Sequence, residues 1–226
     1  EIAGQLLDRP FESLLDDITV ALFEDLIRED GDGYRFQHEK IRDAAYSLVS
    51  EQKKPEIHLK IGNMLLARTD ARGSVLQDAV FHIVRHLNIA APVITDVDRK
   101  LELARLDLMA GEKARRATAY GSAERYFSLA AACLPDNAWT DDHDLCWRLL
   151  LLLGESRFLT GDIDGAERVF DDMLDHAAGT IERAEVYALR VTLYTAIDKP
   201  DKVLAIGLQA LSLLGVRLPK NPGKIR

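Results

Sequence analysis

A histidine pair is the first candidate for chemistry in this chain. His82 and His86 stand four residues apart, so on a helix both imidazoles would lie on one face, where they could bind a metal ion. The H-E-x-x-H motif needs a glutamate after the first histidine, but Ile83 stands there, and no third ligand is close in sequence. We therefore expect no metal at this pair, and interpret it as two histidines with ordinary interior or surface roles.

No other set of side chains combines the groups that an enzyme needs. His38 lies at a predicted strand-to-helix junction without a nucleophile or acid partner, so capping or a buried hydrogen bond is its expected role. The sequence has no Ser-His-Asp order with an elbow motif and no cysteine-rich knuckle. Gly223-Lys224 lacks the upstream glycine and the following Ser or Thr of a phosphate-binding loop. The sequence thus predicts no enzymatic activity, no catalytic residue and no cofactor.

Composition also limits the possible partners. The net charge of −8 disfavours binding to nucleic acids and anionic membranes, because polyanions repel an acidic surface. The longest apolar run, Leu149–Leu153, is far too short to cross a bilayer. Cys133 and Cys146 lie in apolar helical patterns, and we expect free thiols in a reducing cytoplasm, with a disulfide between them as the alternative.

Small residues recur at fixed spacing in the second half of the chain. One copy of the pattern consists of Gly111, Ala123 and Phe127, and the next, 43 residues later, of Gly154, Ala166 and Phe170. Small residues at these offsets allow two helices to approach closely, while the aromatic ring fills the gap between them. Pro135 would end the second helix of the first copy. A weaker third copy has Val191, Val203 and Gly207 in these places.

This pattern resembles the tetratricopeptide-type helical hairpin, a unit of about 34 residues. We expect Gly161 to end one helix in a left-handed cap, and Asp162 or Asp164 to cap the next. The residues in excess of the usual period fall between Asp136 and Leu145, where we expect an extended loop or a lengthened helix with Trp139 and Trp147. Two earlier apolar stripes predict an antiparallel helix pair like a degenerate repeat; they consist of Ile57, Ile61, Met64 and Leu65, and of Val80, Ile83, Val84 and Leu87.

Resemblance to the tetratricopeptide repeat implies a concave face lined by the first helix of each hairpin. It places there Arg105, Leu108, Glu112, Arg115 and Arg116 of the first clear repeat, and Arg148, Leu151, Glu155 and Phe158 of the second. The arginines could clamp an acidic peptide or a partner's carboxylates, because guanidinium groups bind carboxylates in bidentate fashion. The alternative is that they pair with Glu112, Glu155 and other acids and are simply solvated.

The N-terminal residues predict the element order of a winged-helix unit whose beginning is missing. A brief helix over residues 2–7 and a second helix from Phe11 to Glu29 precede a hairpin near residues 26–37 and a third helix over residues 41–49. Between Asp8 and Asp32 there are nine acids against two bases, the wrong sign for a groove-reading helix. We therefore expect a structural winged helix that packs on neighbouring domains.

Residues 34–46, which read YRFQHEKIRDAAY, resemble a known junction. It follows the nucleotide-binding module in large bacterial signal-transduction ATPases of the STAND type, where an aromatic-x-Phe-x-His run precedes a helix with Ala-Ala-Tyr. Leu59–Gly62 and Ile206–Val216 fit the same region, so the resemblance covers essentially the whole chain. It implies a winged-helix remnant and a helical sensor arm without the ATPase, in a piece of a longer protein.

The predicted fold class is all-α apart from the small hairpin. We expect a partial winged-helix-like unit at residues 1–54, tetratricopeptide-like repeats stacked in a right-handed superhelix at 55–218, and a linker at 219–226. The predicted function is a non-catalytic interaction and regulatory module of a cytoplasmic multidomain signalling ATPase or kinase, with a protein or peptide and the adjoining domains as partners. The alternative is the effector arm of a transcription regulator whose winged helix contacts DNA in the full-length protein.

Overall fold

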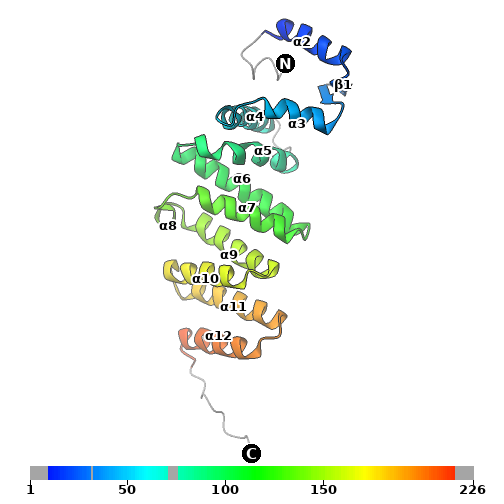
Figure 1. The fold of residues 1–226 in the computed structure, drawn as a ribbon. Helices are drawn as coiled ribbons and strands as arrows, with labels where there is room; N and C mark the ends of the chain where they lie inside the picture. The colour runs from blue at the N-terminus through cyan, green and yellow to red at the C-terminus, as the bar shows by residue number, and fades with distance from the viewer. Residues whose placement is uncertain (1–9, 32, 71–75, 217–226) are drawn as a thin grey trace, which may run out of the picture. The chain divides into compact units, whose positions relative to one another are not determined.

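The computed structural model describes residues 10–31, 33–70 and 76–216 (Figure 1). These residues are mainly α-helical, and their β structure is one two-stranded antiparallel sheet, which confirms the predicted class. None of the described helices is both long and apolar enough to cross a membrane. The chain divides into two compact units, residues 1–95 and 96–226. The expected domain boundary after residue 54 lies within the first unit, inside α4 (Lys53–Asp70).

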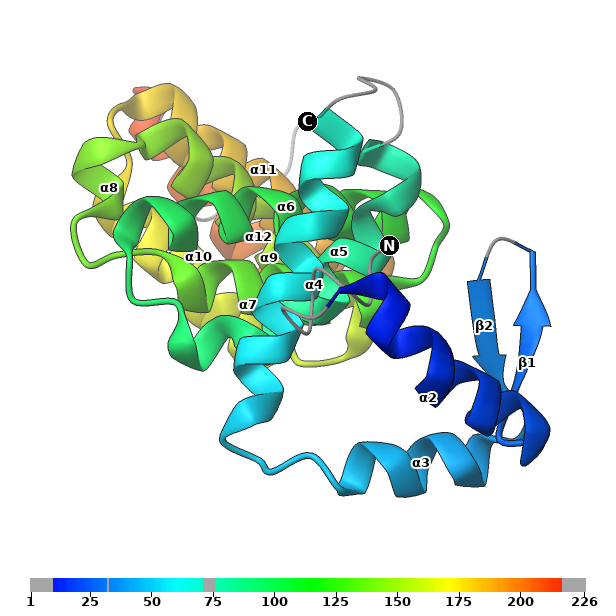
Figure 2. The same ribbon diagram turned by 90° about the horizontal axis from the view of Figure 1, so that it is seen from above.

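The first unit begins with a helix, a hairpin and a second helix. These elements are α2 (Phe11–Phe23), β1 (Ile27–Asp30), β2 (Gly33–Phe36) and α3 (Glu39–Ser47). Figure 2 shows the hairpin projecting from the junction of α2 and α3. The prediction of a helix as far as Glu29 was wrong, because Asp25 adopts a left-handed conformation (φ 53°) and residues from Ile27 onward pair with β2. The predicted helix over residues 2–7 lies outside the described residues, as does the predicted linker at 219–226.

The rest of the first unit is a helix pair followed by a short 3₁₀ turn. α4 packs on α5 (Leu76–Ala90), and η1 (Ala91–Val93) follows. Val80, Ile83 and Val84 on α5 are fully buried, as the apolar stripe predicts. A Cβ added to Gly62 of α4 would lie 2.4 Å from a methyl carbon of Leu87, so the two helices meet through a glycine and a large side chain.

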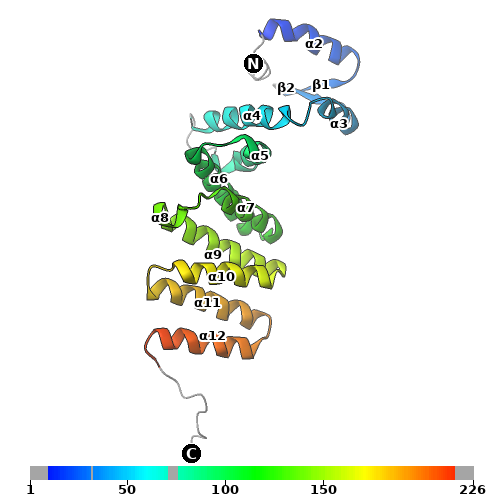
Figure 3. The ribbon, with the colours of Figure 1, turned by 60° about the vertical axis from the view of Figure 1, so that its left-hand side comes forward.

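The described residues of the second unit, 96–216, form three helical hairpins and one short additional helix. The first hairpin is α6 (Val97–Arg116) with α7 (Tyr120–Cys133), the second is α9 (His143–Thr160) with α10 (Ile163–His176), and the third is α11 (Thr180–Ala196) with α12 (Pro200–Leu213). The short helix α8 (Ala138–Asp141) lies between the first two hairpins. Figure 3 shows α9, α10, α11 and α12 side by side in sequence order.

Each of the first two hairpins closes on a contact between a glycine and a phenylalanine. A Cβ added to Gly111 would lie 2.3 Å from the Phe127 ring, and one added to Gly154 would lie 2.4 Å from the Phe170 ring. Both rings are fully buried, as are Ala123 and Ala166. The predicted tight crossings are therefore confirmed, and the aromatic fills the gap as expected. In the third hairpin a Cβ on Gly207 would meet nothing within 4 Å, which agrees with the weaker pattern there.

The turn within each hairpin contains one left-handed residue at the same repeat position. These residues are Thr118 (φ 58°), Gly161 (φ 93°) and Asp198 (φ 53°). Glycine adopts this conformation without a steric penalty, and the prediction of a left-handed cap at Gly161 is confirmed. Asp162 caps the next helix as expected, since its carboxylate accepts a hydrogen bond from the Gly165 N–H at 2.9 Å.

A methyl group at the glycine of either crossing tests this packing. Gly111→Ala or Gly154→Ala should lower the free energy of unfolding by about 1–3 kcal/mol, because the ring must shift within a filled core. Urea unfolding monitored by circular dichroism measures the change. Gly121→Ala on α7, where an added Cβ meets nothing within 4 Å, is the matched control and should be neutral or slightly stabilising. Wild-type stability in both crossing variants would contradict the packing described above.

Candidate interaction surface

The four arginines predicted on the concave face lie on α6 and α9, and each forms an ion pair. The pairs are Arg105–Asp142 (2.8 Å), Arg115–Glu155 (2.9 Å), Arg116–Glu112 (3.7 Å) and Arg148–Glu112. All except Arg116–Glu112 connect α6 to α9 or to the residue that caps it, and so join the first helices of consecutive hairpins. The alternative expectation, that the arginines pair with Glu112, Glu155 and other acids, matches this geometry.

These ion pairs are open to solvent on the arginine side. The exposed fractions of the arginine side chains are 58% for Arg105, 39% for Arg115, 71% for Arg116 and 62% for Arg148. Exposed pairs contribute only about 0–1 kcal/mol each, so a competing carboxylate can replace one at small cost. The hydrogen bond from Arg105 lowers the pKa of Asp142 below its usual value, which keeps that partner ionised. Four guanidinium groups share three carboxylates in these pairs, and one positive charge remains in excess.

The apolar residues expected on the same face divide between core and surface. Leu108 is 7% exposed and Phe158 is 5% exposed, so both belong to the core and present no contact area to a partner. The Phe158 ring lies edge-on to Tyr194 of α11, with ring centroids 5.2 Å apart. Leu151 is half-buried. We define the arginine face as the predicted residues that remain accessible: Arg105, Glu112, Arg115, Arg116, Arg148, Leu151 and Glu155.

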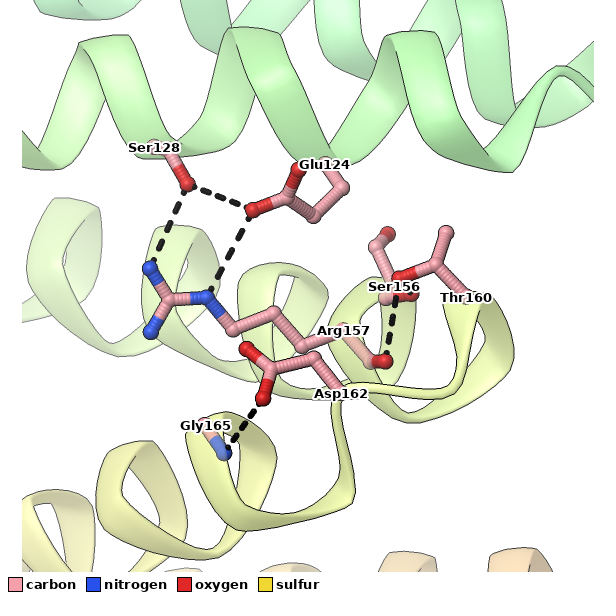
Figure 4. A network of polar contacts seen from close by, with 7 residues as sticks. All are labelled: Glu124, Ser128, Ser156, Arg157, Thr160, Asp162 and Gly165. Atoms are coloured by element: carbon pink, nitrogen blue, oxygen red, sulfur yellow. Dashed lines mark hydrogen bonds and ion pairs between the residues drawn. The ribbon is translucent and has the colours of Figure 1, made fainter.

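A second polar set joins α7 to α9 (Figure 4). The Arg157 guanidinium reaches the Glu124 carboxylate at 3.6 Å and the Ser128 hydroxyl at 3.4 Å, and that hydroxyl donates to Glu124 at 2.9 Å. The carboxylate of Glu124 therefore receives an arginine from the following hairpin. Sequence reasoning missed this set, because no repeat spacing marks Arg157.

The same acceptor positions are used between α10 and α11. Glu167 and Asp171 stand 43 residues after Glu124 and Ser128, and both receive Arg190 of α11, at 3.3 Å for Asp171. The Arg190 side chain is only 13% exposed. Burial raises the pKa of the Tyr194 hydroxyl, and the charge and hydrogen bond of Glu167 raise it further. When the two hairpins are aligned by the 37-residue offset, Arg190 lies four residues, one helical turn, before the position that corresponds to Arg157. The two arginines therefore show no repeat spacing in the sequence.

Aromatic side chains hold the additional helix α8 in place. The Trp139 ring on α8 stacks on His176 at the end of α10, with centroids 4.7 Å apart, and His143 stacks on Trp147 of α9 at 5.8 Å. The Trp147 indole N–H donates to Glu185 of α11 at 2.9 Å. The residues in excess of the usual period therefore form a short helix and the start of α9, anchored on neighbouring hairpins.

His58 and His86 of the first unit lie in a hydrogen-bonded chain with Tyr46. His82 is exposed, whereas Nδ1 of His86 lies 2.8 Å from Nδ1 of His58 on α4, whose Nε2 lies 3.0 Å from the Tyr46 hydroxyl. Within the described ranges no group of three or more His, Cys, Asp or Glu side chains could hold a metal ion. His38 precedes α3 at the N-cap position, but it is exposed and makes no side-chain capping bond, so the predicted capping or buried hydrogen bond was wrong.

His58 and His86 are more easily kept neutral than free imidazole. Burial lowers the pKa of His58 below its usual value, and the charge of Arg85 lowers it further. Burial is also the main cause for His86, whose pKa falls to about 4, with added effects of His58, Arg85 and His82. Protonation of both rings would place two donors face to face across 2.8 Å. Neutral imidazoles therefore stabilise the junction of α3, α4 and α5.

Both cysteines are free thiols, as predicted. Cys146 is buried, and this burial raises its pKa to about 11, while Cys133 is half-buried with a raised pKa for the same main reason. Thiols in this state are poor nucleophiles, because the reactive form is the thiolate.

Comparison with known proteins gives one informative similarity. The chain is 26% identical over 210 residues to the hybrid signal transduction histidine kinase G of Dictyostelium discoideum. The match covers 83% of this chain but only 6% of the length of that protein. No family model matches the chain, and no solved structure matches it. The similarity is consistent with a signalling-related regulatory module.

Acidification should destabilise the first unit through His86. The folded pKa is about 4 and the unfolded value is near 6.5, so the folded state binds fewer protons between these pH values. Stability is therefore lost as the pH falls from 6.5 towards 4, by about 1–2 kcal/mol once solvent screening of the partly exposed ring is included.

Urea unfolding at pH 7.5 and pH 5 measures this loss in the wild type and in His86→Gln. The variant lacks the titrating group, so its stability should change less between the two pH values. An identical pH dependence in both proteins would rule out His86 as the cause.

Proposed function

We propose that this chain is a non-catalytic protein-interaction and regulatory module of a multidomain signal-transduction protein. The observation that carries the proposal is the similarity of most of the chain to a small segment of a hybrid signal transduction histidine kinase. A segment of this kind acts through the domains around it, so its function is to receive a protein or peptide and to communicate that state to its neighbours. The resemblance at residues 34–46 makes a bacterial STAND-type ATPase fused to a kinase the proposed parent.

The arginine face is the proposed contact surface. Its guanidinium groups pair with carboxylates of the same chain, and those exposed pairs are weak. An acidic peptide or the acidic surface of an adjoining domain would exchange its own carboxylates for Asp142, Glu112 or Glu155. The arginine face spans two consecutive hairpins, so a bound partner would also fix their relative position, as expected of a tetratricopeptide-like superhelix. Cytoplasmic localisation and the absence of a cofactor belong to the same proposal.

Charge reversal on both helices of the arginine face tests this function. Arg115→Glu with Arg148→Glu should weaken binding between this chain and the separately expressed adjoining domains of its parent by at least about tenfold, because attraction becomes repulsion at two points. Isothermal titration calorimetry measures the affinity, and the kinase or ATPase output of the intact parent measures the regulatory effect.

A matched control reverses two arginine charges elsewhere. Arg125 and Arg168 are exposed on α7 and α10, 43 residues apart, so Arg125→Glu with Arg168→Glu changes the net charge equally without touching the arginine face. The proposal fails if both double variants bind and signal alike. Tight, salt-dependent binding of random duplex DNA in a low-salt gel shift would favour the transcription-regulator alternative instead.

A further inference from the structure

The outer face of the second helix in each hairpin has a recurring role in the second unit. On α7 this face carries Glu124 and Ser128, and on α10 it carries Glu167 and Asp171 at the same repeat positions. Each set receives one arginine from the hairpin that comes next in sequence, Arg157 in the first case and Arg190 in the second. These positions therefore mark where one hairpin docks on its successor.

The third hairpin has leucines at these positions. Asp198 stands 37 residues after Gly161 at the same turn position, and the same offset places Leu204 and Leu208 where α10 has Glu167 and Asp171. Leu204 is 64% exposed, while Leu208 and Leu211 are half-buried, so the three leucines form a stripe at helical spacing. No helix follows α12 among the described residues, and the stripe has no successor hairpin upon it there.

The change from carboxylates to leucines also changes the kind of side chain that fits. An arginine placed on this stripe would lose its hydration without gaining a hydrogen bond, which is unfavourable. Aliphatic side chains bury apolar area there without any polar group to satisfy. The complementary surface is therefore a helix with aliphatic residues at the two positions, one helical turn apart, that correspond to Arg157 of α9 and to Arg190 of α11.

We propose that Leu204, Leu208 and Leu211 form the docking surface for the first helix of a further helical hairpin of the same polypeptide. Continuity with the two existing interfaces supports this occupant, because both are formed in sequence order by the next hairpin. The inference concerns assembly of the helical array and does not depend on the proposed role of the arginine face.

Substitution in two lengths of the protein tests the docking surface. The first is the 226-residue chain, and the second is the same chain extended by the next ~45 residues of its parent, enough for one further hairpin. Leu204→Glu should change the melting temperature little in the shorter protein, because the side chain is already exposed. It should lower that of the longer protein by about 4 °C or more. Ile181→Glu, at a residue of α11 that is 86% exposed, is the control and should have little effect in either length.

Hydrogen exchange of the wild-type proteins provides a second measurement that no variant can compromise. Amide protection of α12 should rise at least about tenfold in the longer protein, since docking suppresses local opening. Equal protection in both lengths, or an equal effect of Leu204→Glu in both, would overturn the proposal. Self-association of the 226-residue chain in analytical ultracentrifugation, abolished by Leu204→Glu, would also overturn it, because the occupant would then be a second copy.

Discussion

Close contact between a glycine on one helix and a large side chain on its partner is the constraint on which the helical pairs depend. Gly111 faces Phe127 and Gly154 faces Phe170, and both rings are fully excluded from solvent. Gly62 and Leu87 repeat the arrangement in the first unit with an aliphatic side chain. Because a ring or an isobutyl group occupies the space that a Cβ would need, helix separation and side-chain identity are fixed together. The third hairpin of the second unit lacks this contact, and its second helix has fewer buried residues.

Polar contacts between hairpins fall into two classes with different consequences. Arg190 is almost enclosed against Glu167 and Asp171, so this ion pair is costly to break from one side and helps to fix the register of α10 and α11. The pairs of the arginine face are mostly solvated and contribute little to stability. The second unit thus joins consecutive hairpins both by an enclosed ion pair and by solvated ones, and the proposed contact surface uses the solvated ones.

The sequence predicts the close crossings well, because the small and aromatic residues obey a spacing that only packing requires. It also predicts the caps at Gly161 and Asp162, whose residue types have strong local preferences. Helix ends set by pairing elsewhere are not predictable in this way, so α2 was expected to run beyond Phe23. The arginine face was only partly predicted, since periodicity does not distinguish the half-buried position of Leu151 from the core positions of Leu108 and Phe158. Arg157 and Arg190 were missed because they do not share a repeat position. They pair with equivalent residues of α7 and α10, but each arginine comes from a different turn of its own helix.

Length differences along the second unit are confined to one kind of connection. Seven residues separate Gly111 from Thr118, Gly154 from Gly161 and Val191 from Asp198, whereas the 43- and 37-residue offsets differ entirely in the segments that join one hairpin to the next. The turn within a hairpin has a fixed length, because one left-handed residue is followed directly by the next helix. The segment that joins two hairpins can be longer, and one such segment contains the extra helix α8. Each hairpin is therefore a unit of fixed internal geometry, and the segments that join the hairpins vary in length. We expect the second unit to tolerate natural or engineered insertions in these joining segments and not within a hairpin.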